Sequence, residues 1–280
     1  MQRNVRKLFI SSLFCLAVSF LSGCEFKVQL GSQENKETTL EKIRKAAEQG
    51  DAEAQFNLGA CYYEGTGVAQ DDEEAVKWFL KAAEQGHVVA QKNMGVFYGN
   101  GTGVAQDAEK ATQWYRKAAE QGDAEAQYVI GSRYLKGFGV AQDVEKAMEW
   151  FHKAAEQGYA PAQYDLGVYY GSGTGVAQDH EKAVEWCRKA AEQGFALSQQ
   201  NLGLRYDQGG LGVEQDYKEA FQWFLKAAEQ GLASSQHNVG VYYLKGFGVA
   251  EDKEKALQWF RKAAAQGHED SINVLKQQEE

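Results

Sequence analysis

Proline is almost absent from this 280-residue sequence: Pro161 stands alone against 30 glycines. Proline interrupts helices and sheet ladders, so its scarcity permits many unbroken elements, with glycine available for the turns between them. Hydrophobic residues make up 44% and charged residues 25% of the chain. This is an ordinary globular composition, and it excludes a wholly disordered chain.

Basic residues are also in short supply. The chain has 30 Lys and Arg against 39 Asp and Glu, which gives a formal charge of −9. An acidic chain repels phosphate backbones, and no basic stripe runs along this one. We therefore expect no nucleic-acid partner.

Sequence motifs of catalysis and cofactor binding are missing as well. No two of the 5 histidines are four residues apart, and no His-Glu-x-x-His occurs. The glycine runs 99–103 and 171–175 lack the lysine of a phosphate-binding loop, and there is no Gly-x-Ser-x-Gly elbow. The acidic run 71–74 could hold a cation, but carboxylates are expected at a helix N-terminus in any case. We expect no metal, no small-molecule cofactor and no enzymatic activity.

The N-terminal residues 1–23 have the features of an export signal. Arg3, Arg6 and Lys7 precede the apolar run Leu8–Leu21, which is too short for a comfortable membrane span. This pattern predicts a cleaved signal peptide. The mostly polar residues 24–37 that follow are expected to be a flexible tether.

The end of this segment, Leu21-Ser22-Gly23-Cys24, resembles the signal of bacterial lipoproteins. The resemblance implies cleavage before Cys24, lipid and palmitate attached there, and membrane anchoring without a spanning helix. The alternative is an ordinary secretory signal with an incidental cysteine. Glu25 follows, rather than the aspartate associated with inner-membrane retention in enterobacteria. In a Gram-negative host we therefore expect the outer membrane, with the protein facing the periplasm or the surface.

The rest of the chain is built on the motif Lys-Ala-Ala-Glu-Gln-Gly, which occurs seven times with little change. The steps between copies are 36, 36, 36, 36, 37 and 36 residues. A period held this tightly indicates stacked supersecondary units. The copies begin at Lys45, Lys81, Lys117, Lys153, Lys189, Lys226 and Lys262.

Each unit reads as two helices joined by glycine turns. In the first unit Ala54, Leu58 and Tyr62 share one face of a first helix, here called helix A, which is expected to end at the glycines of 65–67. Asp71 is expected to cap a second helix, helix B, which ends at Gly86. All 6 tryptophans recur at one position of helix B, which indicates core packing rather than a ligand cage.

The two ends of the array are half-units. Residues 38–50 supply a lone helix B, opened by Thr38 and Glu41 at capping-box spacing. Residues 269–280 supply a polar last helix A that caps the stack. Cys61 and Cys187 lie in repeats 1 and 4, and stacked repeats advance by roughly 10 Å each, so they are too distant for a disulfide. We expect both to be free thiols.

The pattern Ala-x-Ala-Gln-x-x-Leu-Gly-x-x-Tyr-x-x-Gly-x-Gly-Val-x-x-Asp, followed by Ala-x-x-Trp-x-x-Lys-Ala-Ala-x-x-Gly, resembles the Sel1-like repeat, a relative of the tetratricopeptide repeat. The resemblance implies an all-α fold, a right-handed α-solenoid of stacked helix-turn-helix repeats with helix A lining the concave side. It covers six full units: 52–87, 88–123, 124–159, 160–195, 196–232 and 233–268.

In such a solenoid, the positions that vary on helix A are the candidates for partner binding. A broken aromatic row at Phe56, Tyr128 and Tyr164 either binds a partner or packs on the next unit. The predicted groove residues are Phe56, Tyr63, Lys92, Tyr128, Lys136, Tyr164, His237 and Leu244.

Two classes of function stay open on this sequence. The first is a lipid-anchored, non-catalytic adaptor of the cell envelope that binds a protein or peptide, since envelope regulators and host-interaction factors both occur among Sel1-like proteins. The second is an enzyme acting on cell wall or β-lactam, or an inhibitor of one. Some Sel1-like proteins described as penicillin-binding carry paired cysteines in each repeat, and this chain does not. We expect the adaptor.

Overall fold

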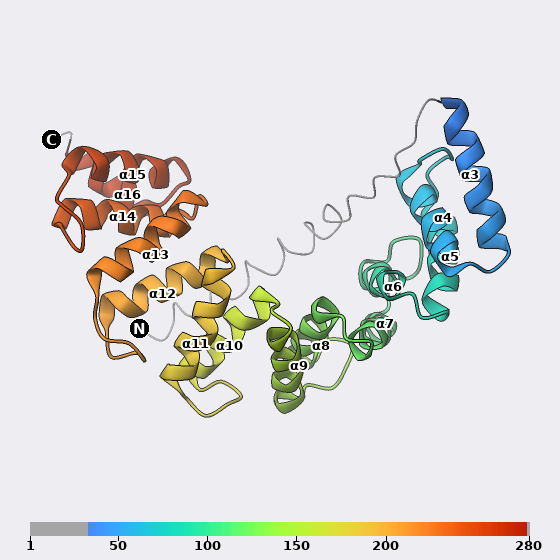
Figure 1. Ribbon diagram of the computed structural model, residues 1–280, viewed down its shortest axis with the longest axis horizontal. Coiled ribbons are helices and arrows are strands. Elements are labelled where there is room, and N and C mark those ends of the chain that lie inside the picture. The colour runs from blue at the N-terminus through green and yellow to red at the C-terminus, as the bar shows by residue number, and fades with distance from the viewer. Residues whose placement is uncertain (1–32, 279–280) are drawn as a thin grey trace.

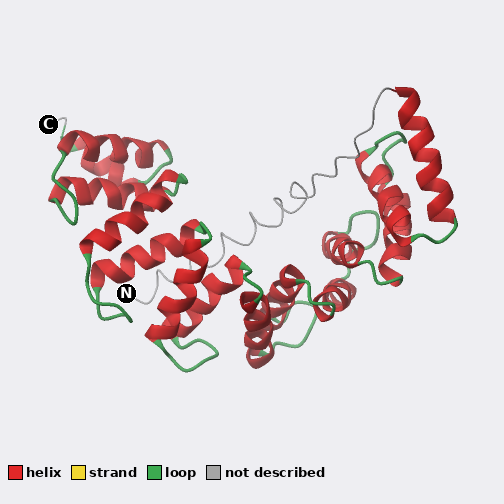
Figure 2. Cartoon of the chain, in the orientation of Figure 1, coloured by secondary structure: helices red, strands yellow, loops and turns green. Residues whose placement is uncertain are grey.

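The computed structural model describes residues 33–278, and its side chains from residue 39. Within this range the chain forms 14 helices and no strand, arranged as an open arc (Figures 1 and 2). Each helix contacts the one before it and the one after it in sequence. This arrangement confirms the predicted all-α solenoid.

Helices A and B alternate along the arc. The first helices of the six units, which we call the helix A row, are α4 (Ala52–Glu64), α6 (Val88–Asn100), α8 (Ala124–Lys136), α10 (Ala160–Ser172), α12 (Ala196–Gln208) and α14 (Ala233–Lys245). The second helices are α5 (Asp72–Glu84), α7 (Ala108–Glu120), α9 (Val144–Glu156), α11 (His180–Glu192), α13 (Tyr217–Glu229) and α15 (Lys253–Ala265). The ends are α3 (Gln33–Glu48) and α16 (Glu269–Lys276).

The helix ends form where the sequence predicts them. Helix α4 stops at Gly65, whose left-handed backbone (φ 70°) lets its N–H reach the Cys61 carbonyl. Helix α5 begins after Asp71, whose carboxylate accepts a hydrogen bond from the Glu74 N–H at 3.0 Å. Equivalent aspartates cap all six helices B.

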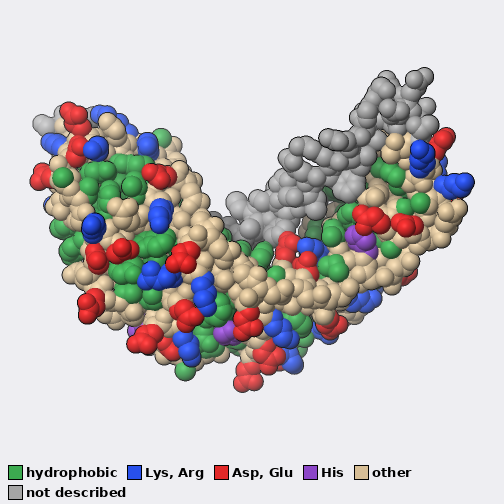
Figure 3. Space-filling model, in the orientation of Figure 1, with side chains coloured by type: hydrophobic (Ala, Val, Ile, Leu, Met, Phe, Trp, Pro, Cys, Tyr) green, Lys and Arg blue, Asp and Glu red, His purple; other side chains and the backbone are tan. Residues whose placement is uncertain are grey.

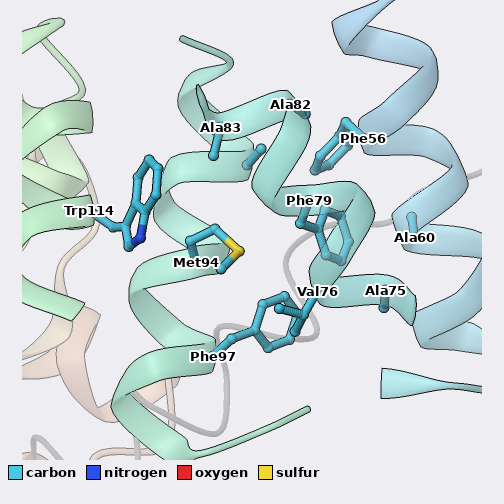
Figure 4. Close-up of a cluster of buried hydrophobic side chains, with 11 residues drawn as sticks. Phe56, Ala60, Ala75, Val76, Phe79, Ala82, Ala83, Met94, Phe97 and Trp114 are labelled. Carbon is cyan, nitrogen blue, oxygen red and sulfur yellow. The ribbon is translucent and has the colours of Figure 1, made fainter. Parts of the chain in front are cut away.

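Glycine in the middle of helix A allows helix B to pack closely against it. A Cβ added to Gly59 would stand only 3.0 Å from the Phe79 ring and 3.1 Å from the Ala75 carbonyl oxygen. Phe79 is therefore buried against the backbone of α4. The first core cluster is built around it, with Met94 and Phe97 from the next helix (Figure 4).

The tryptophans pack on the core, as predicted: Trp114 and Trp223 are buried and the other four are half-buried. Trp114 of α7 lies beside Met94 of α6 in the first cluster (Figure 4), and Trp223 is buried in another. Each of the six is also covered by the lysine that follows three residues later, with Nζ 3.7–4.2 Å from the ring centroid. The lysine of the repeated motif thus lies over the tryptophan of its own helix.

A buried glutamine links each unit to the preceding one. Gln127 of α8 donates to the Ala119 carbonyl at the end of α7, at 3.1 Å. Its own amide oxygen accepts from Gln157, at the end of α9, at 2.7 Å. The same two bonds recur in all six units, and we call this series the glutamine ladder. Each of these carbonyls also accepts a backbone N–H of the following turn, as Ala119 does from Gly122, so the glutamine adds a second bond at the end of the helix.

The ends of the array differ in part from expectation. Helix α3 begins at Gln33, within the expected tether, so the prediction that Thr38 caps this helix is wrong. Helix α16 forms the terminal half-unit. Cys61 and Cys187 are buried free thiols, as predicted. Within residues 33–278 no helix is both long and apolar enough to cross a membrane. The signal segment and Cys24 lie outside the described residues.

We expect Gln127→Met to lower the free energy of unfolding by about 1–3 kcal/mol, because it removes two hydrogen bonds at unchanged volume. The Gln157 amide loses its partner, and the Ala119 carbonyl keeps only its backbone bond from the Gly122 N–H. Thermal unfolding followed by circular dichroism measures this. Gln113→Met, at an exposed position of α7, is the matched control. Equal melting temperatures for the two variants would contradict a stabilising role for the ladder.

Candidate partner-binding surface

The predicted groove residues all lie on the helix A row. Phe56, Lys92, Tyr128, Tyr164 and His237 occupy one repeat position, and Tyr63, Lys136 and Leu244 lie at the C-terminal ends of their helices. The structure separates these two groups. The first group packs inside the stack, mainly on helix B of its own unit and on the turn that follows it. In the second group Lys136 is exposed, whereas Tyr63 and Leu244 are half-buried and Tyr63 packs on Phe97 of the next unit.

The aromatic row packs within the fold. Phe56 and Tyr128 are each only 8% exposed, which leaves little ring surface for a partner. Phe56 lies 5.5 Å from Phe79 and stacks on His87 with centroids 4.6 Å apart (Figure 4 shows its approach to Phe79). Tyr128 packs on Phe151 at 5.5 Å. Of the two interpretations left open by the sequence, the contacts favour packing.

A pairing rule explains this row. Each of its aromatic or charged members contacts the residue just before the next helix A. Tyr164 packs on Phe195 at 5.5 Å, and Lys92 forms an ion pair with Asp123 at 3.0 Å. The two positions vary together along the chain, ring with ring and cation with anion. That internal covariation can be read from the sequence alone, by comparing these two positions along the repeats.

His237 follows the same rule at the C-terminal end. Its ring stacks on His268 with centroids 4.7 Å apart, and its Nδ1 is 2.9 Å from the Ser271 hydroxyl. Ser271 is fully buried in α16. Burial lowers the pKa of His237, and the neighbouring His268 lowers it further. His237 therefore joins the terminal helix to the stack.

A half-buried carboxyl group lies under the row between repeats 3 and 4. The Tyr128 hydroxyl donates to Asp165 Oδ2 at 2.9 Å. Burial raises the pKa of Asp165 to about 6, and only the Tyr128 hydrogen bond and the charge of Lys136 oppose that shift. The matching position holds Asn57, Asn93, Asn201 and Asn238 in other units.

Apolar side chains lie at the surface of the helix A row. Leu204 is exposed, and the residues at its position in three neighbours, Val96, Val168 and Val241, are half-buried. Tyr63 and Leu244 lie one turn further along their helices, also half-buried. On the face shown in Figure 3, hydrophobic side chains gather over the C-terminal units around α12 to α14.

Comparison of the sequence with protein-family models identifies the family of this chain. The Sel1 repeat model matches residues 52–87, 88–123, 124–159, 160–195, 196–232 and 233–268. The protein belongs to the Sel1 repeat family. Comparison of the chain with curated proteins finds no match.

Solved structures of other Sel1 repeat proteins resemble the chain closely. A Sel1 repeat protein from Oxalobacter formigenes is 32% identical, with a TM-score of 0.71, over 84% of this chain and 94% of that one. A protective antigen present in uropathogenic Escherichia coli strains, displaying an SLR fold, is 40% identical with a TM-score of 0.80. That match covers 83% of this chain and 50% of the other, so this Sel1 repeat protein spans half the length of that relative.

Among residues 33–278, no group of three or more His, Cys, Asp or Glu side chains could hold a metal ion. Burial raises the pKa of Cys187 to about 11, which keeps this thiol protonated and unreactive at neutral pH.

We expect Asp165→Asn to stabilise the protein at pH 8 by up to about 2–3 kcal/mol. The folded-state pKa of about 6 lies above the ordinary value of about 3.9 for an unfolded chain, so ionisation costs stability above pH 6. The gain should fade as the pH drops through 6 towards 4. Thermal melts across this range test it, with exposed Glu149→Gln as the control. A gain that grows on acidification would contradict the assignment.

Proposed function

We propose that this Sel1 repeat protein is a non-catalytic scaffold or adaptor of the bacterial cell envelope. It binds a partner protein or peptide through the outward face of the helix A row. Proteins built from Sel1 and related repeats generally mediate protein–protein interaction, and the family is typically a non-catalytic scaffold fold.

The observation that carries the proposal is the shortage of free charge on these helices. In α10 the only charged residue is Asp165, which is half-buried and accepts a hydrogen bond from Tyr128. In α6 it is Lys92, which Asp123 and Glu125 neutralise at 3.0 and 2.8 Å. The exposed part of α6 and α10 is therefore largely uncharged, as the centres of protein interfaces tend to be.

Helices B have the opposite character. Their inner positions carry alanine, phenylalanine and tryptophan, and their outer positions carry exposed Lys and Glu, such as Lys81 and Glu84 of α5. Such a helix has one buried face and one solvated face. The helix A row is thus the surface whose composition favours a partner.

The envelope location rests on the N-terminal sequence, which lies outside the described residues. In this proposal Cys24 carries lipid and holds the protein at the membrane, and the repeats project from it. The lipid anchor would keep the repeat array next to its partners in the envelope.

We expect the double variant Leu204→Glu and Val241→Glu to reduce partner capture at least about tenfold, since two buried carboxylates would cost more than the 1.4 kcal/mol that corresponds to this factor. Crosslinking capture from native envelopes, followed by mass spectrometry, measures it. Gln222→Glu with Gln258→Glu adds the same charge at exposed positions of α13 and α15 and should leave capture unchanged.

Two results would count against the scaffold. One is equal capture by the helix A variant and its control, with both folded by circular dichroism. The other is turnover of nitrocefin or muropeptides by the purified protein, which would favour an enzyme.

The anchor has its own test. Cells expressing the full chain should incorporate labelled palmitate and retain the protein in the membrane fraction, and Cys24→Ala should lose both because the acylated thiol is gone. Cys15→Ala is the matched control. Membrane retention that persists in Cys24→Ala would contradict lipid anchoring at this residue.

A further inference from the structure

Repeats 3 and 6 share a stretch of eight identical residues that the fold itself does not explain. The sequence Tyr-Leu-Lys-Gly-Phe-Gly-Val-Ala occupies residues 134–141 and 243–250, where helix A turns into helix B. We call these two turns the Phe loops. At the position of Phe138 and Phe247, repeats 1, 2 and 4 carry Thr66, Thr102 and Thr174.

The two phenylalanines point outward. Phe138 is 50% exposed and Phe247 is 38% exposed, which places both among the four exposed large hydrophobic residues of the described chain. The threonine loops adopt the same backbone: the flanking glycines have φ of 67° and 67° in the first Phe loop, and of 70° and 76° around Thr66. The turn therefore does not need the aromatic ring.

Each ring is supported from one side. Phe247 stacks on Tyr217 of the preceding unit, with centroids 4.9 Å apart and planes 14° from parallel. Tyr217 is itself 36% exposed, so the pair forms an aromatic surface at the start of α13. Phe138 lies with its centroid 5.1 Å from the Arg133 guanidinium. The rings are held in place before any partner arrives, which reduces the entropy cost of binding.

Positive charge accompanies both rings. Exposed Lys136 and Lys245 stand two residues before them, where the threonine loops have Glu64, Asn100 and Ser172. Exposed Lys218 lies beside the second loop, since its backbone nitrogen is 2.6 Å from the Cβ position of Gly248. Exposed lysines thus accompany both Phe loops on a chain with a formal charge of −9, with exposed Glu251 as a carboxylate beside the second loop.

We propose that the Phe loops are two docking sites for an acidic segment of a partner protein that also carries an apolar side chain. The apolar group packs on the exposed face of the ring, and carboxylates pair with Lys136 or Lys245. This inference rests on the proposed scaffold function and adds a second surface to the helix A row. A partner with two such segments would gain avidity from the two copies.

The structure favours a protein segment over a lipid surface. The rings lie against Tyr217 and beside Arg133 rather than projecting from a loop tip, so they cannot enter an acyl layer deeply. The net negative charge of the whole chain also opposes approach to anionic headgroups.

A random dodecapeptide phage library selected on the purified protein provides the probe. We expect enriched peptides to combine Asp or Glu with an aromatic or aliphatic residue, and their affinity to fall as salt rises. Phe138→Thr with Phe247→Thr installs the residue that other repeats use, and should weaken these peptides about tenfold or more. Lys136→Ser with Lys245→Asn should weaken them likewise, whereas Thr102→Ala with Thr174→Ala should not.

The outcomes separate this inference from the scaffold function. Peptides lost in Leu204→Glu with Val241→Glu but retained in the Phe-to-Thr variant would overturn the Phe loops and leave the helix A row standing. A selection that yields no binding peptide would overturn both surfaces. Flotation with phosphatidylglycerol vesicles that depends on Phe138 and Phe247, without peptide binding, would overturn the protein partner in favour of a membrane.

Discussion

The stacking of this protein depends on one polar interaction, the glutamine ladder. Each buried glutamine of a helix A joins the carbonyl end of the preceding helix B to the end of its own unit's helix B, as Gln91 does between Ala83 and Gln121. A buried amide without partners costs free energy, so the bonds hold only when consecutive units meet in one register. The repeated Lys-Ala-Ala-Glu-Gln-Gly motif supplies that second glutamine, the small residues that let helices approach, and the lysine that covers the tryptophan.

This constraint explains where the protein can vary. The two ladder glutamines and the helix A glycine are the same in every unit. The side chain that packs on the glycine does vary, from Phe79 in the first unit to Tyr115 in the second and Cys187 in the fourth. The row that begins with Phe56 can vary in chemistry, but only together with the residue before the next helix A, as the pairs Lys92–Asp123 and Tyr164–Phe195 show. Residues outside these contacts, such as Leu204 and Phe138, are exposed and free to serve a partner.

Features that depend on nearby residues could be predicted from the sequence, whereas features that depend on packing elsewhere in the stack could not. Helix ends were predictable because glycine at Gly65 and aspartate at Asp71 act locally, on backbone groups a few residues away. The start of α3 at Gln33 was not, since the sequence there has neither a repeat partner nor a strong cap. In the candidate surface Lys136 is exposed and Tyr63 and Leu244 are half-buried, whereas Phe56 and Tyr128 are buried. Helix B of the same unit and the turn after it cover these two rings.

The sequence by itself determined the repeat length, the helix pairs and the family to which the chain belongs, because each repeat encodes the same local turns and the same inward faces. Only the tertiary structure decided which varying residues face solvent. Exposure depends on the neighbouring unit: a ring at Tyr128 is covered by Asp165 and Tyr159 of adjacent helices and turns, while a ring at Phe247 rests on Tyr217 and leaves its other face open. Helical periodicity describes one helix at a time, and it carries no information about how far the next unit reaches over it.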